Sequence, residues 1–297
     1  MTTTDLAPAP LLAEPIVSTQ WLADHLGSDR LLVVDASVVP YAHEGRSGYV
    51  TGHENYIVTG HIPGAVFADL IEEFSDPEGA HPFTRPGLAR FQAAATALGV
   101  DNSTAVVVYD SGVGQWASRL WWLFRAFGYD RVAVLDGGLQ KWTAEERAIE
   151  LGHVEPRPTD AGFVATERPE LWVTTAEVEA IVDGSAPGSL VCAVPPKEFS
   201  GEAGSRPRPG HIPGSISAPA GRLVDRTSNA LLPESALRDT FAPVLGGERV
   251  VAYCGAGIAA AAGALALTLL GERSVALYDG SLNEWTADER RPLVTSA

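Results

Sequence analysis

The chain has 297 residues, of which 45% are hydrophobic, so it is long enough for two domains that each bury a core. Its 37 Asp and Glu residues outnumber its 21 Lys and Arg residues, which gives a formal net charge of −16 at pH 7. This charge repels polyanions and anionic lipid surfaces, so nucleic acid and acidic membranes are poor candidates as partners.

The first residues of the sequence are not expected to form a targeting signal. Residues 1–15, MTTTDLAPAPLLAEP, lack the basic and apolar segments of a secretion signal and are interpreted as a loose leader. No run of about 18 consecutive apolar residues occurs in the sequence, so no membrane span is predicted. We therefore expect a cytoplasmic protein. Its two cysteines, Cys192 and Cys254, are too few for a disulfide framework and have no metal-binding CxxC spacing.

Helical patterns alternate with short apolar runs along the chain. Residues 18–27 and 174–184 begin with a Ser or Thr cap and end at glycine, and residues 118–130 carry a broad apolar face. Six β-branched runs predict buried strands at 31–36, 104–110, 131–136, 189–194, 249–254 and 274–279. This alternation predicts an α/β fold, with mostly parallel sheets covered by helices on both faces.

Three segments recur in the same order in the two halves of the chain. GHIPGAVFADL at 60–70 is matched by GHIPGSISAPA at 210–220. VVVYDSGVG is matched by VVAYCGAGI, and VLDGGLQKW by ALYDGSLNEW, at similar spacings. The repeat is too long for a solenoid with short units and indicates a duplicated domain. Between the copies lies a segment rich in Pro, Gly and charged residues. We expect an N-terminal domain at 16–149, a linker at 150–168 and a C-terminal domain at 169–297.

Cys254 ends the predicted strand 249–254, at the sheet edge where α/β folds place their sites. The following GAGIA predicts a tight turn that leads into an alanine-rich helix, so several backbone N–H groups would point at the sulfur. Such a cradle favours a thiolate and would hold a second, anionic sulfur. The alternative is a structural cysteine before an ordinary turn. Asp110 occupies the same place in the first half, so the fold does not need a cysteine there, which favours a chemical role.

The two α/β halves, the GHIPG segment in each, the Asp-Gly-x-Leu-x-x-Trp elements and the Cys254 loop resemble the two-domain rhodanese family of sulfurtransferases. The resemblance covers roughly residues 16–290 and implies tandem rhodanese-like domains, of which the N-terminal one, with Asp110 at the cysteine position, is catalytically silent. It implies that Cys254 takes sulfur as a persulfide, cradled by the amides of Gly255, Ala256, Gly257, Ile258 and Ala259.

The resemblance also implies the substrates and partners. The donor would be 3-mercaptopyruvate or thiosulfate, and the acceptor a thiophilic molecule such as cyanide or a thiol, with a thioredoxin-like reductant as a further partner. The loop reads CGAGIA, whose glycine pattern is closer to the mercaptopyruvate type (CGSGVT) than to the thiosulfate type (CRKGVT). Ala256 and Ala259 replace the serine and threonine of that pattern. No metal or organic cofactor is expected, because the chain has no Walker loop, Rossmann fingerprint or HExxH motif.

The strand at 189–194 departs from the family's Val-Asp-x-Arg pattern. Cys192 takes the aspartate place and Val194 the arginine place, and Glu198 lies near a later arginine of the family. The expected anion clamp is therefore absent. The cations that would substitute for it, each alternatively a solvated surface charge, are Arg119, Lys197, Arg206 and Arg208.

Two further residues have two interpretations each. His61 either faces the substrate cleft, as the resemblance implies, or stabilises its turn, as its repeat His211 would. Cys192 either fills the space of a lost aspartate, equivalent to Asp35, or forms a disulfide with Cys254 that acts as a redox switch.

Two other functions compete with sulfur transfer. A cysteine phosphatase on this fold needs Cys-x5-Arg to clamp phosphate, and Ala260 stands at the arginine position, which argues against that activity. The main alternative is a degenerate rhodanese-like module that binds or carries sulfur without efficient donor turnover. The missing Ser, Thr and Arg side chains favour this module, and the intact Cys254 loop opposes it.

Overall fold

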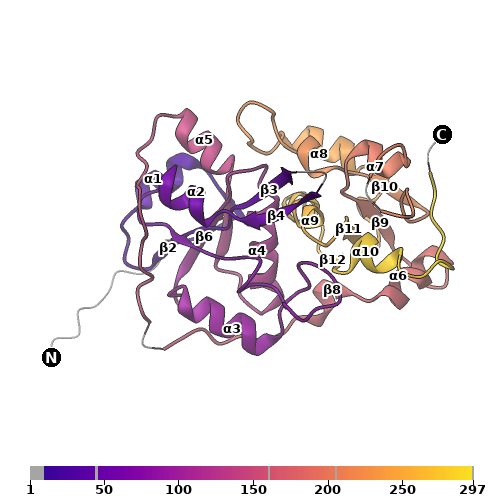
Figure 1. The fold of residues 1–297 in the computed structure, drawn as a ribbon, viewed down its shortest axis with the longest axis horizontal. Coiled ribbons are helices and arrows are strands. Elements are labelled where there is room, and N and C mark those ends of the chain that lie inside the picture. The colour runs from indigo at the N-terminus through magenta and orange to yellow at the C-terminus, as the bar shows by residue number, and fades with distance from the viewer. Residues whose placement is uncertain (1–9, 44–45, 160, 205, 296–297) are drawn as a thin grey trace. The chain divides into compact units, whose positions relative to one another are not determined.

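The computed structural model describes residues 10–43, 46–159, 161–204 and 206–295, which form two compact α/β units (Figure 1). Unit 1 contains the described residues of Met1–Ser75, Pro86–Glu167 and Ser228–Ala230. Unit 2 contains those of Asp76–Arg85, Arg168–Thr227 and Leu231–Ala297. Most of the expected leader, residues 1–9, lies outside the described residues.

Unit 1 is built on a five-stranded sheet in the order β1-β7-β6-β2-β5, and every neighbouring pair is parallel. Its strands are β1 (Ile16–Val17), β2 (Leu31–Asp35), β5 (Val66–Phe67), β6 (Ala105–Tyr109) and β7 (Val132–Leu135). An antiparallel hairpin of β3 (Val38–His43) and β4 (Arg46–Thr51) follows β2. The strands expected at 31–36, 104–110 and 131–136 are confirmed as β2, β6 and β7.

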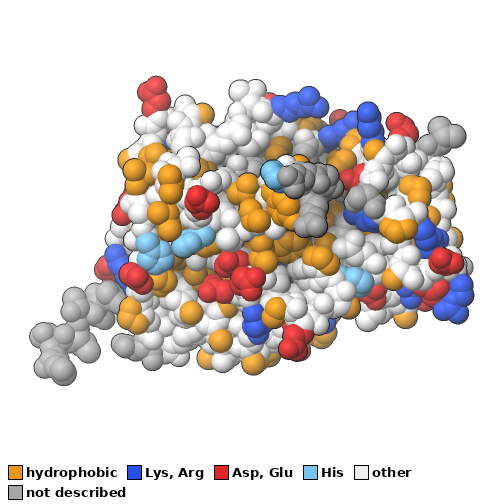
Figure 2. Space-filling view, in the orientation of Figure 1, with side chains coloured by type: hydrophobic (Ala, Val, Ile, Leu, Met, Phe, Trp, Pro, Cys, Tyr) orange, Lys and Arg blue, Asp and Glu red, His pale blue; other side chains and the backbone are white. Residues whose placement is uncertain are grey.

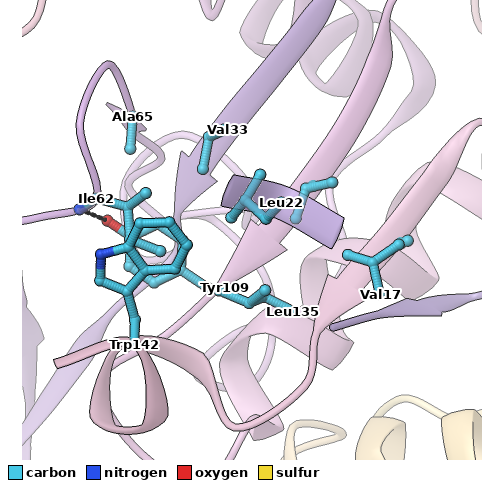
Figure 3. Packing of buried hydrophobic residues seen from close by; sticks show 10 residues of the cluster. Val17, Leu22, Val33, Ile62, Ala65, Tyr109, Leu135 and Trp142 are labelled. Atoms are coloured by element: carbon cyan, nitrogen blue, oxygen red, sulfur yellow. Dashed lines mark hydrogen bonds between the residues drawn. The ribbon is translucent and has the colours of Figure 1, made fainter. Parts of the chain in front are cut away.

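Helices cover both faces of this sheet. The helices of unit 1 are α1 (Thr19–His25), α2 (His53–Val58), α3 (Leu88–Ala97), α4 (Gln115–Ala126) and α5 (Gly138–Ala144). The Ser18 side chain caps α1 by accepting the Trp21 N–H, as the sequence predicts. On one face, Val33 and Tyr109 of the sheet pack with Leu22 of α1 and Trp142 of α5 (Figure 3). Helix α4 packs on β6 and β7. All five residues of β6 are buried, as expected for a strand with both faces covered.

Unit 2 repeats the same topology. Its sheet has the order β10-β9-β11-β12-β8 and is also parallel throughout. The strands are β8 (Trp172–Val173), β9 (Ser189–Cys192), β10 (Ser215–Ser217), β11 (Val250–Tyr253) and β12 (Val275–Tyr278). Read from the other edge, this order matches that of unit 1 strand for strand. The three strands predicted in this half are confirmed as β9, β11 and β12, and the duplication predicted from the repeats is present in the fold.

The helices of unit 2 are η1 (Pro169–Leu171), α6 (Thr175–Val182), α7 (Pro196–Ser200), η2 (Ala220–Arg222), α8 (Glu234–Phe241), α9 (Ala259–Leu269) and α10 (Ser281–Trp285). Thr174 and Glu177 form a capping box at the start of α6. Helix α9 lies beside β11 and β12 (Figure 1). Its residues from Ala260 to Leu267 are all buried, which explains why this segment is apolar on every side.

Each unit includes a segment from the other half of the sequence. Residues 76–85 belong to unit 2, where the Arg85 N–H donates to the Asp279 carboxylate at 2.8 Å. Residues 228–230 belong to unit 1, where the Asn229 side chain donates to the Gly112 carbonyl at 2.8 Å. The segment expected to be a linker packs on unit 1, for example through the Gly152 N–H, which donates to the Ile57 carbonyl. The compact units are therefore discontinuous in sequence, unlike the continuous boundaries expected at 16–149 and 169–297.

The surface has no single acidic region on the side drawn in Figure 2, where Asp and Glu side chains are scattered in separate groups. This distribution agrees with acidic residues that are spread along the sequence. Within the described part of the chain, we find no helix with the length and apolar character needed to cross a membrane.

Candidate active site

Cys254 directly follows β11, which lies between β9 and β12 in the sheet of unit 2. The side chain is therefore at the carboxyl edge of a parallel sheet, as the sequence predicts. Gly257 adopts φ +74°, a left-handed conformation that favours glycine, and turns the chain into α9. Cys254 is buried, with 4% of its surface exposed.

The equivalent loop of unit 1 already holds an anionic group. The Asp110 carboxylate accepts the N–H groups of Gly112, Gly114, Trp116 and Ala117 at 2.8 to 3.0 Å, and the last two belong to the first turn of α4. Burial raises the pKa of Asp110, and these four N–H groups act in the opposite direction because they stabilise the carboxylate. The backbone of this loop is therefore built to surround an anion.

The same positions in unit 2 belong to the Cys254 loop. With Cys254 aligned on Asp110, the residues that correspond to Gly112, Gly114 and Trp116 are Ala256, Ile258 and Ala260. The two loops differ in backbone conformation, because the left-handed glycine is Gly114 in unit 1 and Gly257, one aligned position earlier, in unit 2.

One residue at this loop has no counterpart in the sequence-based expectations. The Ser281 Oγ, at the start of α10, accepts the N–H groups of Cys254 and Gly257, both at 3.1 Å. A comparison of the two repeats could have identified Ser281, because VLDGGLQKW has glycine (Gly138) where ALYDGSLNEW has this serine.

Of the four candidate cations, Arg206 lies at the Cys254 loop. Its Nη2 lies so close to Gly255 that a Cβ on that glycine would overlap with it. Its Nη1 donates to the Glu198 carboxylate at 2.8 Å, and both side chains are less than one-third exposed. The loop is therefore next to a cation whose charge Glu198 partly neutralises.

The other candidate cations have different surroundings. Arg208 donates to the backbone carbonyls of Asp288 and Arg291, so it holds the end of the chain in place. Lys197 is exposed in the first turn of α7. Arg119 belongs to α4 of unit 1 and is only 1% exposed, so it is not a solvated surface charge.

His61 and His211 make the same contacts in the two units. The Nδ1 atom of His61 hydrogen-bonds the Tyr56 carbonyl at 2.9 Å, and the ring stacks on Tyr56. The Nδ1 atom of His211 hydrogen-bonds the Phe199 carbonyl at 2.8 Å, and its ring stacks on Phe199. Both histidines are buried. These contacts match the turn-stabilising interpretation. In the described ranges, no group of three or more His, Cys, Asp or Glu residues is placed to hold a metal ion.

Cys192 lies beside Tyr253, its partner across the β9–β11 pair, and the two side chains are hydrogen-bonded. The Tyr253 hydroxyl also accepts the Ile212 N–H at 2.9 Å. Unit 1 has the same arrangement with Asp35, Tyr109 and Ile62, of which the Ile62–Tyr109 bond is drawn in Figure 3.

Cys192 thus takes the place of Asp35, as the packing interpretation expects. Burial raises the pKa of Cys192 to about 12, and both cysteines are free thiols in the structure.

The family model of the rhodanese-like domain matches the chain twice, at residues 18–145 and 175–288. The chain belongs to the rhodanese family. Its two matched regions carry Asp110 and Cys254 at equivalent places, so both loops described above are rhodanese loops.

Curated relatives support this membership over nearly the whole chain. A thiosulfate/3-mercaptopyruvate sulfurtransferase of Arabidopsis thaliana is 35% identical over 312 aligned residues, covering 96% of this chain and 87% of the relative. A 3-mercaptopyruvate sulfurtransferase of Escherichia coli is 33% identical and covers 93% of this chain and 96% of the relative. The crystal structure of SseA from Escherichia coli superposes with a TM-score of 0.78 at 32% identity, covering 90% of this chain and 98% of that chain. These relatives place the rhodanese chain described here among the sulfurtransferases.

Proposed function

We propose that this protein transfers sulfane sulfur from a small anionic donor, 3-mercaptopyruvate or thiosulfate, to a thiophilic acceptor through a persulfide on Cys254. The observation that carries the proposal is the Asp110 carboxylate, which is held by four loop N–H groups in unit 1. A persulfide on Cys254 would bring a negative charge to the corresponding loop of unit 2, which likewise leads into the N-terminus of a helix, α9.

The first half of the reaction loads the sulfur. The Cys254 thiolate attacks the outer sulfur of the donor, an S–S bond forms, and the bond from that sulfur to the rest of the donor breaks. Thiosulfate then leaves as sulfite. 3-Mercaptopyruvate leaves as pyruvate, because its carbon takes the electron pair of the C–S bond and the proton of the thiol. In both cases the outer sulfur of Cys254 is left as an anion.

The second half returns the enzyme to its starting state. A nucleophile such as cyanide attacks the outer sulfur, and the S–S electron pair returns to Cys254 as a thiolate. Cyanide leaves as thiocyanate, so atoms and charge balance over the cycle. We expect Arg206 to bind the anionic end of the donor, because its guanidinium lies against Gly255.

Intact mass measured after incubation with each donor tests the proposal. Wild-type protein should gain one sulfur atom that cyanide removes, and Cys254→Ser should gain none, because a hydroxyl is a far poorer nucleophile at neutral pH. Cys192→Ala is the matched control, which removes the other thiol and should still gain the sulfur. A wild-type protein that gains no sulfur from either donor would instead be the sulfur-binding or carrier module without turnover.

A further inference from the structure

Ser281 is a buried serine whose hydrogen-bonding capacity is fully used. Its hydroxyl donates to the Tyr278 carbonyl at 2.8 Å and accepts the N–H groups of Cys254 and Gly257. A hydroxyl has one proton to donate, so the Ser281 proton is committed to a carbonyl and its lone pairs face the loop. This orientation makes Ser281 an acceptor for the backbone and removes it from proton transfer to a substrate.

The backbone at Ser281 has an unfavourable conformation for a serine. Its φ is +51°, and the equivalent residue of unit 1, Gly138, has φ +52°. Glycine adopts this region freely, whereas a side chain there costs free energy. The two residues therefore share a φ value that glycine would adopt at lower cost, and what distinguishes unit 2 at this position is the added hydroxyl group.

The two loops differ in what accepts their N–H groups. In unit 1 the Asp110 carboxylate accepts four of them. Gly138, the residue equivalent to Ser281, lies so close to Asp110 that a Cβ on Gly138 would overlap with the Asp110 carbonyl oxygen. In unit 2 the residue at that place is Cys254, which brings no carboxylate. Ser281 accepts two other N–H groups of this loop, those of Cys254 and Gly257, which correspond to Asp110 and Val113 of unit 1. Because a buried N–H group without an acceptor is costly, the Ser281 hydroxyl stabilises the loop in this conformation.

We propose that Ser281 is a positioning residue that keeps the Cys254 loop in its cradle conformation before sulfur is loaded. Its hydroxyl accepts the N–H groups of Cys254 and Gly257. These two hydrogen bonds fix the backbone of the loop and so orient the neighbouring N–H groups, at Ala256, Ile258 and Ala260. The inference rests on the proposed persulfide chemistry and adds to it the residue that prepares the loop.

Two variants separate positioning from simple stabilisation. Ser281→Gly removes the hydroxyl and the backbone strain, whereas Ser281→Ala removes the hydroxyl and keeps the strain. In single-turnover mass measurements, both variants should load sulfur at least about tenfold more slowly than wild type, because the N–H groups of the loop are no longer preorganised. The KM for the sulfur-donating substrate should change by less than about threefold. The melting temperature should be lower for Ser281→Ala than for Ser281→Gly, by about 2 to 4 °C.

Equal loss of loading rate in two variants of different stability is the expected result. Loading rates within about twofold of wild type, or a rate loss that follows the melting temperature, would overturn the proposal. Amide hydrogen exchange of residues 250–260, measured without donor, supplies a readout that is independent of turnover. Exchange at the Cys254 and Gly257 amides should rise in both variants, and unchanged exchange would also overturn the proposal. A wild type that loads no sulfur but shows this protection would overturn the proposed function instead.

Discussion

Arg206 and Gly255 are in direct contact, with the Arg206 guanidinium in the space that a side chain on Gly255 would occupy. Glu198 holds the same guanidinium through its other terminal nitrogen at 2.8 Å. The Cys254 loop contains no cation of its own, so this arginine brings positive charge to it from a different segment. Glu198 limits that charge, because an anionic donor must compete with a carboxylate already bound.

The first prediction concerns Gly255→Ala. Gly255 does not have a positive φ, so alanine fits the backbone, and the new methyl group meets only the end of the flexible Arg206 side chain. The guanidinium should move away from the loop and the donor KM should rise about tenfold, the usual contribution of a hydrogen bond to a charged group. Steady-state kinetics with both donors measures this change, and the melting temperature serves as the control. An unchanged KM would show that Arg206 does not bind the donor.

The second prediction concerns Glu198→Gln, which removes the carboxylate that competes for Arg206. The KM for an anionic donor should fall by about twofold to fivefold, since a partly exposed ion pair contributes up to about 1 kcal/mol. Glu202→Gln is the matched control, because Glu202 is an exposed acid nearby whose side chain contacts Ser200. An equal fall in KM for both variants would mean that net charge alone is responsible.

The third prediction concerns the stability contributed by Asp35. Burial raises its pKa from 3.8 to about 6, hydrogen bonds from Ser37 act in the opposite direction, and the Asp110 charge raises it further. Because the folded-state pKa is the higher one, the protonated carboxyl stabilises the fold. This stability is fully present below about pH 4 and is lost as the pH rises through about 6.

Asp35→Asn cannot ionise, so it should gain stability relative to wild type by about 3 kcal/mol between about pH 4 and pH 7. Urea unfolding of both proteins at several pH values in this range measures the difference. A difference that does not change with pH would contradict the raised pKa.

The fourth prediction concerns the two thiols. Cys192 is buried and its pKa is raised to about 12, so it is almost entirely protonated at neutral pH and reacts slowly, because the thiolate is the nucleophile. Iodoacetamide should label Cys254 first in the native protein and Cys192 only after unfolding, as peptide mapping would show. Cys192→Ala should leave the native labelling unchanged. A disulfide between the two cysteines after mild oxidation would instead favour the redox switch.

The fifth prediction concerns the loop of unit 1. Asp110→Asn replaces one acceptor oxygen by an NH₂ group that faces two backbone N–H groups. The loss of these charge-assisted bonds should destabilise the protein by about 2 to 4 kcal/mol, measured by chemical denaturation. A loss below about 0.5 kcal/mol would show that the loop has little preference for an anion.

The sequence by itself determined the central strands and the place of Cys254. Strands of a parallel sheet that are buried on both faces consist of continuous apolar, β-branched residues, so β6 and β11 could be predicted from the sequence alone. Turn glycines after β11 then indicate a site at the carboxyl end of this strand. The repeat adds the comparison between Asp110 and Cys254, which is why the nucleophile could be proposed from sequence.

The short edge strands were decided only by the tertiary structure. β1 and β8 have two residues each, too few to show any periodicity, and they exist because they pair with β7 and β12. Pairing with a sheet depends on residues far away in the chain, which local patterns do not encode.

The surroundings of Cys254 were likewise decided by tertiary structure. Ser281, which contacts the loop, lies 27 residues after Cys254 in the sequence. Arg206, which also contacts it, belongs to the segment before β10. Neither residue type is unusual where it stands in the sequence, because a serine at a helix start and an arginine in a loop are common. Their roles come from the parallel sheet, which brings the carboxyl ends of β9, β11 and β12 to one edge and so places their following loops together.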